Sequence, residues 1–186
     1  HPHSASGDSP RPGGAGATAP VDLIVVIDTS GSMGDEAADL SAAADAAIQA
    51  AMANCPADLR VSWFGIEGTW VARDPSTKFT QSYREYLLAN GLISSDADLI
   101  GTPGDLEDGA AAIVDLAEHF DWRGSATRAI FFLGDEPLEG GTPQDANDVA
   151  AADGAIAAAN ARAVTVFTYA GTGILEAAKS EYARVA

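Results

Sequence analysis

The chain has 186 residues, 47% of them apolar, which suits a single globular domain. Acidic side chains number 27 and basic ones 10, so the formal net charge is −17. This charge excludes binding to nucleic acid or to an anionic membrane surface, because both depend on lysine and arginine. The single cysteine, Cys55, excludes an internal disulfide and a thiolate zinc site. No apolar run approaches the roughly 20 residues that cross a bilayer, so no membrane insertion is expected.

Residues 1–20 contain Pro, Gly, Ser and Ala but no large apolar side chain. Such a segment cannot bury enough surface to offset the entropy lost when it becomes ordered. We therefore predict a disordered tail or linker over residues 1–20 and one folded domain over residues 21–186.

Strands and helices are predicted to alternate after residue 20. Short β-branched and aromatic runs predict strands, and Ala-rich amphipathic stretches predict helices. The predicted strands are 21–27, 59–64, 69–72, 129–133 and 163–169. The predicted helices are 35–53, 81–89, 107–120, 143–161 and 174–186, with Thr142 as the N-cap of the fourth. This alternation predicts a three-layer α/β fold with a mainly parallel central sheet flanked by helices.

Two aspartates directly follow buried strands of this predicted sheet. Asp28 ends the first apolar run, and Asp135 follows the run AIFFL and one glycine. In an open parallel sheet the carboxyl ends of the strands form one edge, and ligands bind there. We therefore expect Asp28 and Asp135 to lie at the same edge.

The loop after the first strand carries oxygen ligands at close spacing. Asp28, Ser30 and Ser32 supply one carboxylate and two hydroxyls within five positions. Such hard ligands match Mg²⁺, Mn²⁺ or Ca²⁺. One carboxylate holds such an ion poorly, so further charge must come from other loops, and Asp135 is placed to supply it. The alternative is ordinary helix capping by these side chains. The position of Asp135 at the end of another strand of the predicted sheet favours the metal site.

These motifs resemble those of a von Willebrand factor A (vWA) domain with a metal-ion-dependent adhesion site. In that family an Asp-x-Ser-x-Ser motif follows a buried strand, as Asp28, Ser30 and Ser32 do here. The family's last motif is an Asp at the end of a later apolar strand, matched by Asp135. The resemblance covers about residues 21–186 and implies a vWA or Rossmann-like fold. The family ordinarily continues with a further strand, which this fold is expected to lack or to receive from elsewhere.

The family usually adds a Thr just before a helix as a further ligand, and two residues compete for this role. Thr102 lies in the loop GTPGD, whereas Glu107 lies six positions before the apolar helix residue Ile113. The second arrangement is similar to that of integrin β subunits, where a Glu replaces the Thr. Glu107 is therefore preferred, and Thr102 is the alternative metal ligand.

Asp35 and Glu36 have two interpretations. The integrin β branch follows its serine loop with two acidic residues that hold an adjacent calcium, and Asp35 and Glu36 match those positions. The other interpretation, which we favour from the sequence, is that they are first-turn acids that complement the helix dipole.

The resemblance implies a protein-binding or adhesion module and not an enzyme. In the family a Mg²⁺ ion, with Mn²⁺ or Ca²⁺ as alternatives, is coordinated in part by an acidic residue of a protein partner. The tail and the lack of disulfide pairs fit an exported bacterial protein, outside the cell or on its surface. A cytoplasmic location is the alternative.

Two other functions remain open at the sequence level. vWA-type domains also serve as intracellular assembly modules that work with an ATPase partner. The loop from Asp28 to Ser32 also resembles the Asp-Thr-Gly-Ser loop of aspartic proteases. That hydrolase fold is almost all β and needs a second such loop, which is missing here.

Overall fold

The computed structural model describes residues 18–71, 75–141, 143–174 and 176–186. Within them the chain forms a four-stranded, all-parallel sheet in the order β2-β1-β3-β4. The strands are β1 (Pro20–Ile27), β2 (Asp58–Gly65), β3 (Thr127–Gly134) and β4 (Val164–Ala170). The α-helices are α1 (Gly34–Asn54), α2 (Tyr83–Ala89), α3 (Gly109–His119), α4 (Ala146–Ala161) and α5 (Glu176–Val185). Two short 3-10 helices, η1 (Gly31–Met33) and η2 (Asp96–Asp98), lie in connecting segments. The predicted three-layer α/β fold is confirmed.

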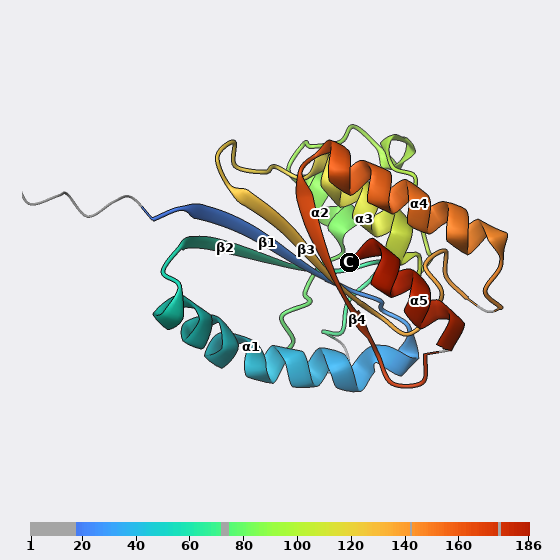
Figure 1. Ribbon diagram of the computed structural model, residues 1–186, viewed down its shortest axis with the longest axis horizontal. Coiled ribbons are helices and arrows are strands. Elements are labelled where there is room, and N and C mark those ends of the chain that lie inside the picture. Colours follow the sequence, from blue (N-terminus) through green and yellow to red (C-terminus); the bar gives the residue numbers. More distant parts are fainter. Residues whose placement is uncertain (1–17, 72–74, 142, 175) are drawn as a thin grey trace, which may run out of the picture.

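The sheet separates two layers of helices of unequal size. Figure 1 shows α1 on one face and α2, α3, α4 and α5 on the other. Successive side chains of β1 point to opposite faces of the sheet, as in any β-strand. Ile24 and Val26 belong to the larger core with α2 to α5, whereas Val25 and Ile27 belong to the smaller core with α1. Burial on both faces explains why residues 23–27 of β1 are an unbroken apolar run.

The predicted strand at 69–72 is wrong for the residues that the structure describes. Residues 69–71 form no strand, and Ala72 lies outside the described residues. Trp70 is buried in the smaller core with Met33 and Ala37, so its segment is a loop held in place by one large side chain. A short apolar run is ambiguous between these two outcomes.

Several boundaries also differ from the prediction. Helix α4 begins at Ala146 and not at residue 143, because Asp145 caps it through a hydrogen bond from the Asn147 backbone N–H. The proposed cap Thr142 lies outside the described residues. Pro20, assigned to the tail, is the first residue of β1. The tail prediction for residues 1–17 lies outside the described residues and stays a prediction.

No helix among the described residues is both long and apolar enough to span a bilayer.

Candidate metal centre

The register of the sheet brings the ends of β1 and β3 together. Ile27 pairs with Leu133, so Asp28 and Asp135 leave adjacent strands at the same edge of the sheet. The Asp28 backbone N–H donates a hydrogen bond of 2.8 Å to the Leu133 carbonyl. Both aspartates are buried, with 1% of Asp28 and 8% of Asp135 exposed.

The loop from Asp28 to Ser32 folds back on itself. Asp28 Oδ1 accepts a hydrogen bond of 2.6 Å from the Ser30 backbone N–H, and the hydroxyl oxygens of Ser30 and Ser32 lie 3.0 Å apart. Ser30 precedes η1 as its N-cap, but its side chain makes no capping hydrogen bond, and neither does that of Met33 before α1. The helix-capping alternative therefore does not describe what these hydroxyls do.

The surroundings of Asp28 are strongly negative. Burial, with smaller contributions from the charges of Asp135 and Glu107, raises the pKa of Asp28 to about 7 against the opposing hydrogen bonds from Ser30. Asp28 Oδ2 and Asp135 Oδ1 are buried and have no hydrogen-bond partner among the described residues. A buried carboxylate without a donor or a cation is unfavourable. These oxygens, with two hydroxyls beside them, fit a hard divalent cation.

Glu107 and Thr102, the two competing ligands, have different surroundings. Leu106 accepts a hydrogen bond of 3.1 Å from the Thr29 backbone N–H, which joins the Glu107 segment to the Asp28 loop. The Glu107 charge is close enough to raise the pKa of Asp28. Its Oε2 accepts a hydrogen bond of 3.1 Å from the Gly141 backbone N–H. Thr102 is exposed at the surface, and its carbonyl accepts a hydrogen bond from the Asp105 backbone N–H.

Asp35 and Glu36 lie in the first turn of α1 but have different contacts. Asp35 is exposed, and a hydrogen bond with Glu36 lowers its pKa. Glu36 Oε1 accepts hydrogen bonds from the Thr172 backbone N–H at 2.8 Å and from its hydroxyl at 3.0 Å. Glu36 Oε2 is buried and has no partner in the described part of the chain. Glu36 therefore joins α1 to the loop after β4, a role that neither sequence interpretation included.

The loop after β4 closes tightly over this region at Gly171. A Cβ at Gly171 would lie 2.8 Å from Met33 Sδ, 3.1 Å from Glu36 Oε1 and 3.3 Å from Asp135 Cβ. A larger residue at Gly171 would therefore require Met33 or the loop to shift. Gly171 also donates a backbone hydrogen bond of 2.8 Å to the Gly134 carbonyl, beside Asp135.

Glu136 is an acidic residue of this site that sequence reasoning missed. Its Oε2 is buried and lacks a partner among the residues described. Burial raises the pKa of Glu136, and the charges of Glu107 and Asp135 raise it further. The signal in the sequence was its position directly after Asp135, in the string Gly-Asp-Glu-Pro.

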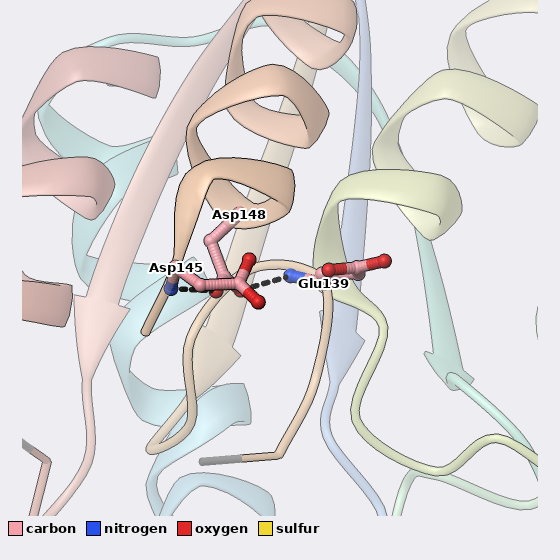
Figure 2. Close-up of side chains that lie close together, drawn as sticks. All are labelled: Glu139, Asp145 and Asp148. Carbon is pink, nitrogen blue, oxygen red and sulfur yellow. Dashed lines mark hydrogen bonds between the residues drawn. The ribbon is translucent and has the colours of Figure 1, made fainter. Parts of the chain in front are cut away.

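A separate acidic triad lies in the segment that enters α4. Among the described residues, one group of three acidic side chains has its carboxylate oxygens within 4.8 Å of one another. Its members are Glu139, Asp145 and Asp148. Asp28, Glu107 and Asp135 are not gathered that closely. Figure 2 shows the Asp148 carboxylate between the backbone nitrogens of Asp145 and Glu139, which donate hydrogen bonds of 2.8 Å and 3.0 Å. One Asp148 oxygen therefore completes the capping box of α4, and the other holds the backbone at Glu139.

Comparisons with known proteins find similarity in structure alone. No family model matches the sequence, and neither does any curated protein. Two solved structures of proximal thread matrix protein 1 from the mussel byssus are similar to the chain at 15% identity. One is described as crystal form 2 and the other as having a zinc occupied MIDAS motif, with TM-scores of 0.46 and 0.45. Each match covers 91% of this chain, which spans 42% of that protein's chain.

Proposed function

We propose that this chain is a vWA-type module that binds a protein partner through a divalent cation and is not an enzyme. The observation that carries the proposal is a pair of buried carboxylate oxygens on adjacent strand ends, Asp28 Oδ2 and Asp135 Oδ1, which have no hydrogen-bond partner within the described part of the chain. The residues that would hold the ion are Asp28, Ser30, Ser32, Glu107 and Asp135. When bound, Mg²⁺, or Mn²⁺ or Ca²⁺ in its place, supplies a positive charge that attracts a carboxylate of the partner.

The protein's own residues organise this edge before any ion arrives. The hydrogen bond from Ser30 holds Asp28 Oδ1, which leaves Oδ2 for another ligand. The hydrogen bond from Gly141 likewise holds one oxygen of Glu107. Because the carboxylates of Asp28, Glu107 and Asp135 repel one another, a cation between them would lower their mutual repulsion. The carboxylates of Asp28, Glu107 and Asp135 would have to move closer together to share one ion.

The partner is expected to present one exposed Asp or Glu on a surface that is otherwise neutral or basic. The net charge of −17 repels an acidic partner at long range, so a single carboxylate is accepted only at contact. We propose an extracellular or cell-surface setting for this binding. The alternative is an intracellular assembly module that works with an ATPase partner. The aspartic-protease alternative requires an almost all-β fold, and the parallel α/β fold of this chain argues against it.

Calorimetric titration of Mg²⁺, Mn²⁺ and Ca²⁺ into the chelator-treated protein tests the proposal. The wild type should bind one ion at this site, and Asp28→Ala and Asp135→Ala should each weaken binding at least about tenfold. Asp45→Ala is the matched control, because Asp45 is an exposed acid on α1 that pairs with Lys78. Equal affinities of the wild type and Asp28→Ala would show that the site assignment is wrong.

The same titration compares Glu107→Ala with Thr102→Ala. We expect the larger loss of affinity from Glu107→Ala, because it removes a full charge next to Asp28 and not just a hydroxyl dipole. A larger loss from Thr102→Ala would reverse the choice between the two ligands.

A further inference from the structure

Arg84 is a buried cation in a chain whose net charge is −17, and only 6% of it is exposed. It is the second residue of α2, whose start is fixed to the sheet. The Gly65 backbone N–H at the end of β2 donates a hydrogen bond of 3.0 Å to the Gln81 carbonyl, and Ser82 caps the helix. Because a buried charge is unfavourable unless it is paired, the partners of Arg84 indicate its role.

The guanidinium of Arg84 joins two segments of the chain to α2. Its Nε donates a hydrogen bond of 3.1 Å to Glu67 Oε2, in the loop after β2. Its Nη1 donates one of 3.1 Å to Asp96 Oδ1, and its Nη2 donates one of 2.8 Å to the Gly101 carbonyl. Asp96 and Gly101 belong to the segment between α2 and α3. Arg84 therefore connects this segment to the loop after β2.

The loop that follows η2, residues 99–107, is held at Gly101 from both sides. The Gly101 backbone N–H donates a hydrogen bond of 3.1 Å to Asp115 Oδ2, and its carbonyl accepts the one from Arg84. Asp115 lies in α3 and is 1% exposed. A Cβ at Gly101 would overlap Tyr83 Oη, so the loop backbone packs directly on α2. Two buried groups of opposite charge thus bind the N–H and the C=O of one residue and fix its position.

Glu67 extends this network to the edge of the sheet that carries Asp28. Its Oε2, which Arg84 holds, also accepts a hydrogen bond of 3.3 Å from the Gly104 backbone N–H. The Glu67 carbonyl accepts a hydrogen bond from the Thr29 hydroxyl, and Thr29 directly follows Asp28. Contacts therefore run from Arg84 through Glu67 both to the loop and to the residue next to a proposed ion ligand.

We propose that Arg84 is a positioning residue for the cation site. It holds loop 99–107 in place, so that Glu107 at the end of this loop stays close to Asp28. Within the described part of the chain, none of the hydrogen bonds of Arg84 goes to a proposed ion ligand, so its effect on the ion is indirect. The inference rests on the proposed function, because it assigns Arg84 a role at that site.

The sign of the charge separates positioning from simple electrostatics. A positive charge repels a cation, so loss of the Arg84 charge would by itself raise the affinity for the ion or leave it unchanged. Positioning predicts the opposite, because the Gly101 carbonyl and the Glu67 carboxylate lose their donor and the loop becomes free to move. Residues that orient metal ligands typically contribute about 10- to 100-fold to metal affinity.

Calorimetric titration of Mg²⁺ and Ca²⁺ into the chelator-treated whole chain tests this role. Arg84→Gln should bind the ion at least about tenfold more weakly than the wild type. Arg84→Lys keeps the charge but not the planar fork of donors, so it should also lose affinity. Arg123→Gln is the matched control and should keep the wild-type affinity. Arg123 also binds two carboxylates, Asp22 and Asp58, and a backbone carbonyl, but at the opposite edge of the sheet.

Amide hydrogen exchange in the ion-free protein, followed by nuclear magnetic resonance, tests the positioning itself. The Gly101 and Gly104 amides should exchange faster in Arg84→Gln than in the wild type, because their loop is less firmly held. They should exchange close to the wild-type rate in Arg123→Gln. Circular dichroism checks the folding of each variant, and Arg84→Lys replaces Arg84→Gln in both measurements if the Gln variant does not fold.

Four outcomes would overturn the proposal. An affinity of Arg84→Gln equal to or above that of the wild type would do so, and the metal site would stand if Asp28→Ala still weakened binding. Unchanged exchange at Gly101 and Gly104 would show that Arg84 does not hold the loop. An equal loss of affinity in Arg123→Gln would reveal a general effect of lower stability. Unchanged affinity in Asp28→Ala would show that the metal site itself is wrong, and the positioning role would fall with it.

Discussion

Asp22 and Asp28 lie at opposite ends of β1 and are equally buried, with 1% of each exposed, but their surroundings are opposite. Burial alone would raise the pKa of Asp22, but hydrogen bonds from Arg60 and Arg123 lower it below its usual value. The Arg60 and Arg123 nitrogens lie 2.8 Å and 2.7 Å from its oxygens. Burial raises the pKa of Asp28, which has no cationic side chain beside it among the described residues. Asp22 therefore stabilises the fold as a carboxylate. The carboxylate form of Asp28 is unfavourable where it lies, and a bound cation would stabilise it.

We therefore expect Asp28→Asn to stabilise the ion-free protein and Asp22→Asn to destabilise it. The pKa of Asp28 is about 7 in the folded protein and 3.8 ordinarily. The protonated carboxyl of Asp28 therefore stabilises the folded protein by up to about 4 kcal/mol relative to the ionised form. This stabilisation is fully present below pH ~4 and is lost as the pH rises through about 7. The advantage of Asp28→Asn over the wild type should grow between pH 5 and pH 8 in urea unfolding with chelator present.

Asp22→Asn is the contrasting variant in the same measurement. Its carboxylate is ionised throughout this range, so the variant should lose about 3 kcal/mol at both pH values because two arginines lose their partner. An advantage of Asp28→Asn that does not change with pH would contradict the assignment of an elevated pKa to Asp28.

At the scale of elements, two helical glycines face different surroundings. Gly109 is the first residue of α3, and a Cβ placed there would lie 2.3 Å from Phe132 Cζ of β3. The start of α3 therefore sits directly on the central sheet, two residues after Glu107. Gly154 lies within α4, and a Cβ there would have no neighbour within 4 Å. The first glycine is required by packing, whereas the second only lowers helix propensity.

Gly109→Ala should destabilise the protein by about 1–3 kcal/mol, since either Phe132 or α3 has to move. Gly154→Ala should stabilise it by roughly 0.5–1 kcal/mol, because alanine loses less backbone entropy in a helix. Urea unfolding of both variants measures the two effects. Similar changes in both would show that the contact between α3 and Phe132 does not restrict this position.

At the scale of the whole molecule, negative charge exceeds positive charge by 17, and much of the positive charge is paired. Arg60 and Arg123 bind Asp22, and Arg84 lies between Glu67 and Asp96. The remaining acids repel one another across the surface. Self-repulsion of this kind destabilises the compact state and is screened by salt.

Raising NaCl from 10 to 300 mM should therefore raise the thermal unfolding midpoint of the chelator-treated protein. A shift of roughly 2–4 °C corresponds to about 1 kcal/mol in a domain of this size. Mg²⁺ at matched ionic strength should add a further increase in the wild type but not in Asp28→Ala, since a ligand that binds only the folded state stabilises it. An equal response of both proteins to Mg²⁺ would mean that the ion acts by screening alone.

The sequence by itself determined the features that depend on neighbouring residues. The apolar run of β1 and the amphipathic pattern of α3 are local, so their type and approximate bounds could be predicted. The spacing of Asp28, Ser30 and Ser32 is also local, and so is the position of Asp135 after its strand. Where local patterns were ambiguous, as at residues 69–71 and at the start of α4, a buried Trp70 or the Asp145 cap decided the outcome.

Only the tertiary structure decided which distant residues meet. The strand order places the end of β1 beside that of β3, and the hydrogen bond from Thr29 to Leu106 brings the Glu107 segment to the same edge. The burial of Glu136, the link from Glu36 to Thr172 and the hydrogen bonds of Arg84 likewise arise from contacts between segments far apart in the chain. Burial and the exclusion of water depend on the packing of the whole domain, and no local pattern of residues specifies them.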